Sequence, residues 1–455
     1  MSDEQTRRPN VIVFFTDQQR WDTTGINGNP LGLTPNFDRM AQEGTHFRHT
    51  FTCQPVCAPA RSTLQTGLYP TKTTVYRNGP ALPEDSITLA HHFKEAGYRT
   101  GYIGKWHLAD GDPVPRSQQG GYDDWLGANI LEFVSQPYNT VLYDNDQNEV
   151  NLPGYRVDAM TDAVIRYIDE HKEEPFFLFV SYLEPHHQNH LDDYVAPDGY
   201  REQFTARWMP PDLAALGGSA HQHMGGYLGI IKRLDESLGR MQDAIKSLGL
   251  ADDTVVLYTS DHGSHFKTRN SEYKRSCHEA SIRVPTAMTG PGFAGGGEIP
   301  ELISLADIPP TLLDAAGIPV PKEFDGKSVL SLMKQRAAGE AIDWPEEVFL
   351  QISESQVGRA VRTKRWKYSV MAPEGDGVND SCADHYVEEF LYDLECDPYE
   401  LTNLIGLESH REVADVMRER LIRRMVEVGE VAPTIDNAPS RPAGQRWVTS
   451  EQAHS

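Results

Sequence analysis

The N-terminal part of the chain alternates short, continuous hydrophobic runs with longer stretches of helical periodicity. Runs that are apolar at every position are typical of strands buried on both faces of a sheet, whereas recurrence every three or four residues is typical of a helix. The alternation predicts an α/β fold with a large mixed, mostly parallel sheet sandwiched by helices. The expected strands are Asn10–Thr16, Tyr98–Ile103, 176–181 and Thr254–Thr259, and the expected helices include Arg156–His171 and His221–Leu248.

From about Ile342 the pattern changes to short strands separated by turns, followed by one long helical stretch that ends before Gly429. Sequential strands followed by a helix predict a small α+β subdomain with an antiparallel sheet. We therefore predict an N-terminal domain over residues 1–341 and a C-terminal subdomain over residues 342–455, which ends in an extended tail. The expected elements are strands at Val348–Ile352, Gly358–Arg362, Trp366–Val370 and Glu389–Leu394 and a helix at His410–Val428.

The composition restricts the kinds of ligand that the chain can bind. Its formal net charge is -24, from 42 Lys and Arg against 66 Asp and Glu residues. Such a charge argues against nucleic acid or an anionic membrane as a partner, and the hydrophobic runs are far too short to cross a bilayer. A site for an anion must then be a local basic island, for which Arg61, Lys105 and Lys274 are the candidates.

The N-terminal segment and the cysteines bear on the compartment. The segment MSDEQTRRPN is polar and continues directly into the first hydrophobic run, with neither the apolar stretch nor the cleavage site of a secretion signal. The cysteines are odd in number and scattered, so they indicate neither a disulfide framework nor a zinc site. We expect a cytoplasmic protein from the sequence as it stands. The five cysteines are Cys53, Cys57, Cys277, Cys382 and Cys396.

Polar side chains directly follow two of the predicted strands. Asp17 and Gln18 come after the first strand, and Asp261 and His262 come after the strand that ends at Thr259. Ligands of open α/β sheets bind at the carboxyl ends of the strands, and neighbouring parallel strands would bring the two pairs together. Carboxylate and amide oxygens suit a divalent cation, and the imidazole shifts the preference towards Mn²⁺.

A second pattern surrounds Cys57, in the segment Cys57-Ala58-Pro59-Ala60-Arg61. Pro59 fits the first turn of a helix from about Pro59 to Leu68. Such a helix places Arg61 one turn from Cys57 and directs backbone N–H groups towards the same space, which predicts a pocket for an anion. A lone cysteine is more often a buried structural residue. Matching groups elsewhere favour the pocket: Lys105 and His107 share one face of an extended segment.

The segment Cys-x-Pro-x-Arg resembles the signature of type I sulfatases, members of the alkaline phosphatase-like superfamily. In that family the cysteine is oxidised to formylglycine, and the hydrated aldehyde is the nucleophile. The resemblance covers roughly residues 9 to 404, with the motifs in the family's order. Leu68 stands where the family often has arginine, and His278 stands where an aromatic residue is usual. The further matching motifs are Asp17-Gln18, Gly104-Lys105-Trp106-His107, Ser260-Asp261-His262-Gly263, Lys274 and Arg283-Val284-Pro285.

The resemblance implies a sulfatase that hydrolyses a sulfate monoester through a formylglycine-sulfate intermediate. Lys105 would bind a sulfate oxygen, and His107 would take a proton when the intermediate collapses. His186, with His187 as the second choice, and Lys274 would protonate or stabilise the departing alcohol oxygen, and Arg61 would stabilise the developing charge. The implied cation is Ca²⁺ first, with Mn²⁺ or Mg²⁺ open, and its implied ligands are Asp17, Gln18, Cys57, Asp261 and His262.

The resemblance also implies a bacterial source, a carbohydrate sulfate as substrate and a formylglycine-generating enzyme as a transient partner. Residues 110–153, rich in Gly, Pro and Asn, and residues 191–218 predict long surface loops whose aromatic side chains suit a sugar ring, although a small aryl or alkyl sulfate fits as well. Two alternatives stay open. One is a formylglycine-dependent phosphonate monoester hydrolase or phosphodiesterase, and the other is a non-catalytic anion-binding protein with Cys57 as a thiol. A metal-only phosphatase is disfavoured because Cys57 is neither Ser nor Thr.

Overall fold

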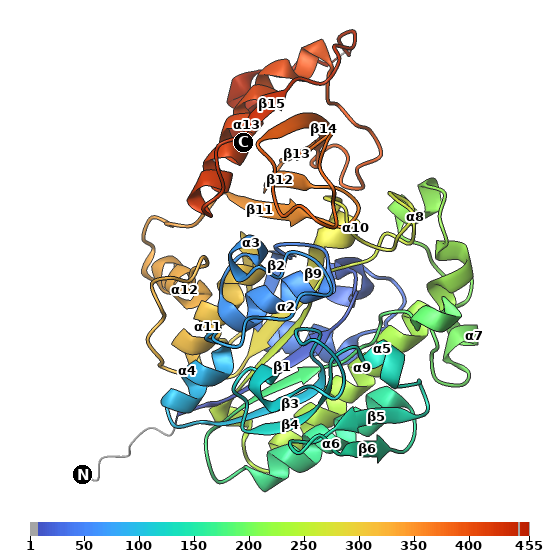
Figure 1. The fold of residues 1–455 in the computed structure, drawn as a ribbon, viewed down its shortest axis with the longest axis vertical. Coiled ribbons are helices and arrows are strands. Elements are labelled where there is room, and N and C mark those ends of the chain that lie inside the picture. Colours follow the sequence, from blue (N-terminus) through green and yellow to red (C-terminus); the bar gives the residue numbers. More distant parts are fainter. Residues whose placement is uncertain (1–7, 445, 455) are drawn as a thin grey trace.

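The computed structural model describes residues 8–444 and 446–454, which form two β-sheets (Figure 1). The large sheet has ten strands, and its central strands run parallel, as do the outer pair β10 and β2. The antiparallel pairs lie towards both ends, so the prediction of a mixed, mostly parallel sheet is confirmed. The strands, in spatial order, are β10 (Gly297–Ser304), β2 (Thr45–Phe51), β9 (Arg283–Thr289), β8 (Thr254–Ser260), β1 (Asn10–Thr16), β7 (Phe176–Ser181), β3 (Arg99–Lys105), β4 (Asp124–Ala128), β5 (Thr140–Tyr143) and β6 (Glu149–Leu152).

Helices cover both faces of this sheet, and every residue of its central strand β1 is therefore buried. Ile12 and Phe14 pack with residues of α1, α6 and α9, whereas Val13 and Phe15 pack with residues of α2, α4 and α11. The helices are α1 (Pro35–Glu43), α2 (Cys57–Thr66), α3 (Pro70–Thr73), α4 (Leu89–Glu95), α5 (Leu131–Val134), α6 (Arg156–Glu170), α7 (Tyr200–Phe204), α8 (Pro211–Ala215), α9 (Ala220–Ser247), α10 (Glu279–Ile282), α11 (Ile308–Ala315) and α12 (Val329–Ala338).

The second sheet belongs to a C-terminal unit, residues 347–436, which lies above the large sheet in Figure 1. Its first four strands are antiparallel neighbours, β14 and β15 are parallel, and α13 packs on the sheet. One apolar core joins this unit to the helices of the large sheet, with Phe349 and Tyr368 in the same cluster as Leu64. The elements are β11 (Glu347–Ile352), β12 (Gly358–Thr363), β13 (Trp366–Met371), β14 (His385–Asp393), α13 (Arg411–Glu427) and β15 (Thr434–Asp436).

The prediction that residues 110–153 are only surface loops is wrong. They contain β4, the one-turn helix α5 and the hairpin β5–β6, which extends the large sheet at one edge. The hairpin turns at Asp144, whose Oδ1 accepts hydrogen bonds from the backbone N–H groups of Asp146 and Asn148. Its strands are short, and β6 alternates between exposed and half-buried positions. Edge strands of this kind bury too little apolar surface to give a strong sequence pattern.

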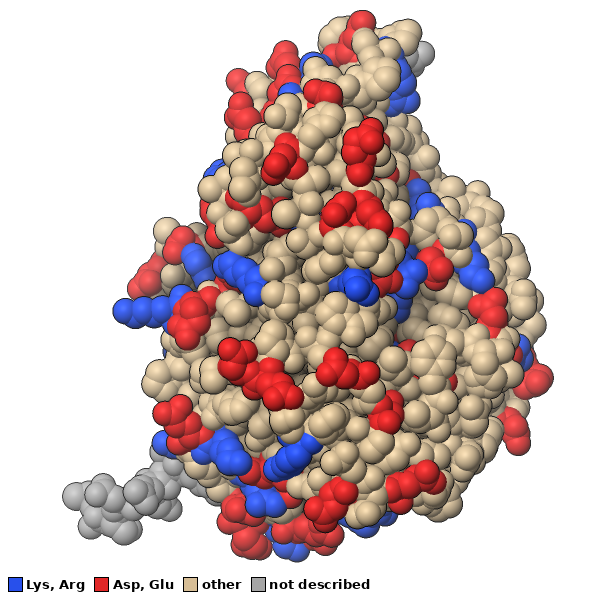
Figure 2. All heavy atoms as spheres, in the orientation of Figure 1, with Lys and Arg blue, Asp and Glu red and all other residues tan. Residues whose placement is uncertain are grey.

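The surface shows how the charge is distributed. Figure 2 shows acidic side chains spread over the visible face and a hollow between the C-terminal unit and the part of the molecule that carries α7 and α8. Lys and Arg side chains line part of the rim of this hollow. Among the described residues, no helix combines the length and the hydrophobicity that crossing a membrane requires.

Candidate active site

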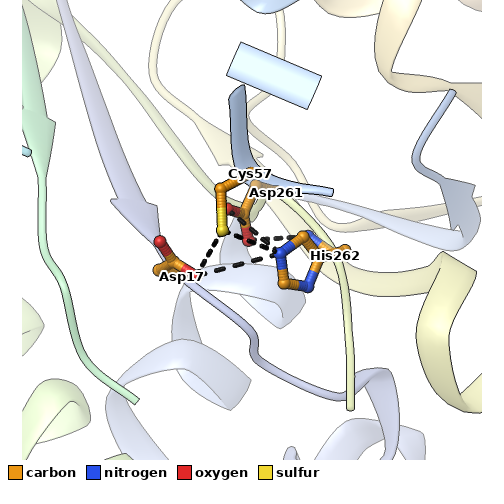
Figure 3. A group of neighbouring side chains, drawn as sticks. All are labelled: Asp17, Cys57, Asp261 and His262. Carbon is orange, nitrogen blue, oxygen red and sulfur yellow. Dashed lines mark hydrogen bonds and ion pairs between the residues drawn. The ribbon is translucent and has the colours of Figure 1, made fainter. Parts of the chain in front are cut away.

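The two polar pairs that follow β1 and β8 meet at the carboxyl-terminal ends of these two strands. The strands are parallel neighbours, with Thr16 opposite Ser260, so Asp17 and Asp261 leave the sheet side by side. Cys57, the first residue of α2, approaches the same point from above the sheet. Figure 3 shows the side chains of Asp17, Cys57, Asp261 and His262 turned towards one another, and their ligand atoms all lie within 4.8 Å of each other. The four side chains are buried.

Local hydrogen bonds orient the atoms of this cluster. Asp261 Oδ1 accepts from the backbone N–H groups of Gln18 at 2.9 Å and His262 at 2.8 Å, which leaves Oδ2 buried without a hydrogen-bond partner. His262 Nδ1 lies 2.9 Å from the carbonyl oxygen of Gly263, which can only accept, so Nδ1 carries the proton and the lone pair of Nε2 faces the cluster. Nε2 lies 3.3 Å from Cys57 Sγ and 3.5 Å from Asp261 Oδ2.

Gln18 completes a set of donors that fits a divalent cation. Its backbone is left-handed, with φ 69°, and its Nε2 donates to the hydroxyl of Tyr194 at 2.9 Å. Its Oε1 is buried and has no partner among the described residues. A buried oxygen without a partner is costly unless a ligand fills the space. Gln18 Oε1, Asp261 Oδ2 and the lone pair of His262 Nε2 are therefore the observations that support a cation here.

Two cationic side chains, Lys105 and Arg61, form ion pairs with Asp17. Lys105 Nζ lies between Asp17 Oδ2, at 2.8 Å, and Glu132 Oε1, at 3.0 Å, and its side chain has no exposed surface. Arg61 donates to the same Asp17 oxygen at 2.9 Å, to Ser181 Oγ at 2.7 Å and to the carbonyl oxygen of Lys105 at 2.9 Å. Both predicted cations thus lie in the pocket, and both are held by buried acceptors.

Lys274 and His186 lie beside the nucleophile position. Lys274 Nζ is 2.7 Å from Cys57 Sγ, 3.1 Å from His262 Nε2 and 3.4 Å from His186 Nε2. His186 Nδ1 donates to the carbonyl oxygen of His187 at 2.6 Å, so its Nε2 is free to accept from Lys274. His187, the second choice, stacks on His186 with ring centroids 4.4 Å apart, and His186 rather than His187 contacts Lys274.

His107 enters the pocket differently from the sequence expectation. Its backbone is left-handed, with φ 61°, so the chain is not extended from Lys105 to His107 and the argument that the two side chains share a face does not apply. Its backbone N–H donates to the carbonyl oxygen of Asn129 at 2.8 Å, and its buried Nδ1 has no hydrogen-bond partner among the described residues. The exposures of His107, His186 and Lys274 are 9, 6 and 6%, whereas that of Cys57 is 1%, so these three side chains are slightly more accessible than the cysteine.

The pocket stabilises negative charge at Cys57. Burial and the Asp17 carboxylate raise the pKa of the Cys57 thiol, but Lys274 and Lys105 outweigh them and bring it from 9.0 to about 7. Burial raises the pKa of the thiols of Cys53 and Cys277 to about 12, and at Cys277 the charge of Lys367 lowers the pKa without outweighing burial. The contrast shows that the pocket, rather than burial, selects Cys57 for chemistry that develops a negative charge.

The other titratable groups adjust to the same charges. Burial raises the pKa of Asp17, but the charges of Lys105 and Arg61 outweigh it, so the pKa of Asp17 lies well below its usual value. Burial and the charge of Asp17 raise the pKa of Asp261. Burial and, after it, the charge of Lys105 lower the pKa of His107 to about 3, so this imidazole is neutral near pH 7.

The expected contribution of the helix N-terminus is wrong in one respect. The helix α2 begins at Cys57, earlier than predicted, and the N–H of Ala58 already donates to Asn78 Oδ1 at 3.1 Å. Pro59 has no N–H, and the N–H of Ala60 donates to the carbonyl oxygen of Val56. The positive character of the pocket therefore comes mainly from side chains.

Three residues that form hydrogen bonds with residues of this site were not identified from the sequence: Ser181, Glu132 and Asn78. Ser181 is the last residue of a predicted strand, so the strand-end rule that found Asp17 would also have found it. Glu132 lies in α5, inside the segment expected to form loops, and Asn78 lies outside any regular element. No periodicity or motif indicates either residue.

The fold and the location of this pocket define the class of protein. A mixed sheet covered by helices, with an anion pocket at the carboxyl ends of its parallel strands, is the alkaline phosphatase-like arrangement. The chain belongs to the sulfatase family, whose model matches residues 9–318, and it is a sulfuric ester hydrolase. The model for the C-terminal region of N-sulphoglucosamine sulphohydrolase matches residues 271–427. The family and the enzyme class predicted from the sequence are thereby confirmed.

Named relatives cover nearly the whole chain. The chain is 29% identical to an ulvan-active sulfatase of Formosa agariphila over 446 residues, which are 94% of this chain and 83% of that protein. It superposes with a TM-score of 0.76 and 22% identity on a structure solved in complex with its substrate D-glucosamine-2-N,6-O-disulfate, over 93% of this chain and 98% of the other. The TM-score is 0.70, with 22% identity, for a phosphonate monoester hydrolase of Agrobacterium radiobacter, over 92 and 96% of the two chains.

Proposed function

We propose that this protein hydrolyses the sulfate monoester of a carbohydrate to the alcohol and inorganic sulfate, with Cys57 converted to formylglycine. The observation that carries the proposal is the convergence of Arg61, Lys105 and Lys274 on one buried pocket around Cys57, in a chain whose overall charge is strongly negative. The sulfated saccharide bound by one structural relative and the ulvan activity of another relative support a carbohydrate as the substrate.

The cation in this proposal is held by the side chains that already converge. Asp17, Gln18, Asp261, His262 and the modified Cys57 would be its ligands. Once bound, the cation would supply positive charge to a sulfate oxygen and lower the pKa of the hydrated aldehyde. The oxygen donors suit Ca²⁺, which we place first, whereas His262 leaves Mn²⁺ or Mg²⁺ open.

The remaining residues neutralise the anion and move protons. Lys105 and Arg61 hold Asp17 and surround the developing charge on the sulfate group. Lys274 Nζ carries the proton that the departing alcohol oxygen needs, and His186 Nε2, 3.4 Å away, orients that ammonium group. His107, whose buried Nδ1 has no hydrogen-bond partner among the described residues, is the base that accepts a proton as sulfate leaves.

Mass spectrometry of one peptide tests the nucleophile. The tryptic peptide 49–61 contains Cys57, and protein made beside an active formylglycine-generating enzyme should carry an aldehyde there in place of the thiol. Release of sulfate from a sulfated monosaccharide should then follow the modified fraction. A thiol at Cys57 in protein that still releases sulfate would contradict the proposed nucleophile, and modified protein that is inactive on sulfate esters would contradict the reaction.

A second candidate function rests on the residues Gln18 and His262. The Asp-Gln and Asp-His pairs resemble those of formylglycine-dependent phosphonate monoester hydrolases, and one such hydrolase shares the fold. The discriminating measurement is kcat/KM on a sulfate monoester and on a phosphonate monoester of the same phenol. We expect the sulfate ester to be the faster substrate, and the reverse order would favour the second candidate.

A further inference from the structure

One loop of the C-terminal unit contacts two chain segments near Cys57, one that contains Asn78 and one that contains Arg275. Residues 353–356 follow β11, and Glu354 in this loop is left-handed, with φ 64°. Its backbone N–H donates to the carbonyl oxygen of Gly377 at 2.6 Å, and Ser355 Oγ donates to the carbonyl oxygen of Arg275 at 2.7 Å. A left-handed backbone is unfavourable for a residue with a side chain, so it persists where surrounding contacts fix it. The loop is therefore a fixed support.

The carboxylate of Glu354 links two chain segments that lie next to Cys57 and Lys274. Oε1 accepts from the backbone N–H of Asn78 at 2.6 Å, and Asn78 Oδ1 accepts from the N–H of Ala58, the residue after Cys57. Oε2 forms an ion pair with the guanidinium of Arg275, the residue after Lys274. The side chain of Glu354 is only 11% exposed, so both contacts are shielded from solvent.

Arg275, in the segment that contains Lys274, is held by several contacts. This residue is also left-handed, with φ 70°, and its N–H donates to the carbonyl oxygen of Pro55 at 3.2 Å. Lys274 therefore precedes a residue that is held on one side by the segment before Cys57 and on the other by Glu354. Arg275 also pairs with Glu272 at 3.4 Å, but Glu272 belongs to the same segment, so among the described residues only Glu354 links Arg275 to the C-terminal unit by an ion pair. The direction in which Lys274 leaves the backbone depends on this link, because without it Arg275 would lose a contact that holds an unfavourable conformation.

We propose that Glu354 is a positioning residue for catalysis. Its carboxylate fixes the distance between Lys274 and the first turn of α2, so that Lys274 Nζ lies 2.7 Å from Cys57 Sγ. The assignment rests on the proposed function, in which Lys274 gives its proton to the departing alcohol. Glu354 itself does not touch the reacting atoms; it acts through Arg275 and Asn78. The C-terminal unit thus contributes to the chemistry through one partly buried carboxylate.

Attachment of the C-terminal unit does not depend on this carboxylate. Lys367 of β13 lies 2.8 Å from Glu279 of α10, and the two parts of the chain also share a continuous apolar core. Replacing Glu354 by glutamine keeps the shape of the side chain and removes its charge. The unit should stay attached in such a variant, while the fixed distance between Lys274 and α2 relaxes.

The test compares Glu354→Gln with Glu388→Gln, a matched control. Glu388 is a buried carboxylate of the C-terminal unit, but it pairs with Arg411 and Arg418 inside that unit. Each variant is assayed on 4-nitrophenyl sulfate, whose leaving group needs no proton, and on an alkyl or sugar sulfate, whose leaving group needs one. A displacement of about 1 Å at a catalytic group can cost about a hundredfold in rate.

We expect Glu354→Gln to lower kcat on the alkyl sulfate by about 10- to 100-fold, with KM nearly unchanged, and to lower kcat on 4-nitrophenyl sulfate only a few-fold. Glu388→Gln should keep both rates per folded molecule within about twofold. A merely structural role of Glu354 would lower both rates alike, because it would reduce the amount of folded enzyme. The formylglycine content of each protein is measured by peptide mass, so that a difference in modification is not mistaken for a difference in turnover.

Three outcomes would decide against the proposal or its basis. Equal losses on the two substrates, or losses equal to those of Glu388→Gln, would overturn the positioning role. If Glu354→Gln does not fold, Arg275→Met removes the other partner of the ion pair and must show the same dependence on the leaving group, and its failure to do so also overturns the role. Wild-type protein that carries formylglycine but turns over neither ester would instead overturn the proposed function.

Discussion

Two clusters of buried charge, one around Cys57 and one between the two sheets, both pair carboxylates with Lys and Arg, but they differ in character. The second, which we call the interface cluster, consists of Glu279, Arg362, Lys367 and Glu400. Each cluster combines buried carboxylates with a lysine and an arginine. Lys367 Nζ lies 2.8 Å from Glu279 and 2.6 Å from Glu400, much as Lys105 Nζ lies between Asp17 and Glu132.

The difference lies in how completely the atoms are paired. In the interface cluster Arg362 donates to both oxygens of Glu279, and the backbone N–H of Glu279 donates to Glu400 Oε2 at 2.7 Å. None of its four side chains has an unpartnered buried atom among the described residues. Around Cys57, in contrast, Gln18 Oε1 and Asp261 Oδ2 have no hydrogen-bond partner among the described residues, although Arg61 lies 3.6 Å from Asp261 Oδ2. A saturated cluster can only hold the fold together, whereas an unsaturated one keeps the capacity to bind a ligand.

The largest expected effect separates the two lysines. Lys105→Met should lower kcat/KM by about 10²–10³-fold, because it removes a cation aimed at developing negative charge. Lys367→Met leaves Glu279 and Glu400 buried without their shared cation, and it should lower the free energy of unfolding by about 3–5 kcal/mol. Urea unfolding and kcat/KM per folded molecule measure the two effects.

The same pair of variants can contradict the comparison. Lys367→Met should keep kcat/KM within a few-fold when it is assayed where it is folded, since none of the interface cluster touches the reacting atoms. Lys105→Met also leaves two buried carboxylates, Asp17 and Glu132, without their shared cation, so the deciding quantity is activity. If Lys105→Met keeps kcat/KM per folded molecule within a few-fold of the wild type, the cluster around Cys57 is a structural element like the other one.

A smaller effect concerns the cation. Treatment with a chelator should lower the free energy of unfolding, and adding back Ca²⁺ to about a hundred times its Kd should restore about 2.7 kcal/mol. Asp17→Asn should abolish most of this gain, because Asp17 supplies a ligand atom. Glu279→Gln, in the interface cluster, should keep it. Equal stability with and without Ca²⁺, Mn²⁺ or Mg²⁺ would show that the unpartnered oxygens do not bind a cation.

The smallest expected effect is a pH dependence of opposite sign for two carboxyl groups, Asp261 in the cluster around Cys57 and Glu279 in the interface cluster. Burial and Asp17 raise the pKa of Asp261 above its ordinary 3.8, so folded protein without a cation keeps a proton that the unfolded chain loses. This contribution is complete below pH 3.8 and is lost as the pH rises through the folded pKa. Asp261→Asn cannot titrate, so in chelator its stability relative to the wild type should increase with pH.

Glu279 should behave in the reverse way. Burial raises the pKa of its carboxyl, but Arg362 and Lys367 outweigh burial and lower the pKa below its ordinary 4.5. Its contribution to stability is present above pH 4.5 and is lost as the pH falls through the folded pKa. The stability of Glu279→Gln should therefore decline less than that of the wild type below pH 4.5. Urea unfolding between pH 3 and 8 measures both slopes, and slopes of the same sign would refute the contrast.

The sequence indicated the parts of the site that follow strands or carry a family motif. Asp17 and Asp261 were predictable because each follows a continuous hydrophobic run, and parallel pairing of β1 and β8 brings them together. Glu132 and Glu354 were not predictable. Each lies in a segment without periodicity and reaches the site only through tertiary packing, and Glu354 comes from the other sheet. Local pattern cannot report such distant contacts, and the hairpin β5–β6 was missed because its strands bury too little apolar surface.

The burial of α2 has a consequence for the timing of synthesis. Every residue of α2 is buried in the folded chain, so the proposed conversion of Cys57 would require an enzyme to reach this segment before the fold closes around it. About 300 residues separate Cys57 from Glu354, which completes the support of the pocket. At a synthesis rate of about 5–20 residues per second, the ribosome needs about 15–60 s to add them. The order of the residues along the chain thus leaves Cys57 open for that interval before the active site is assembled.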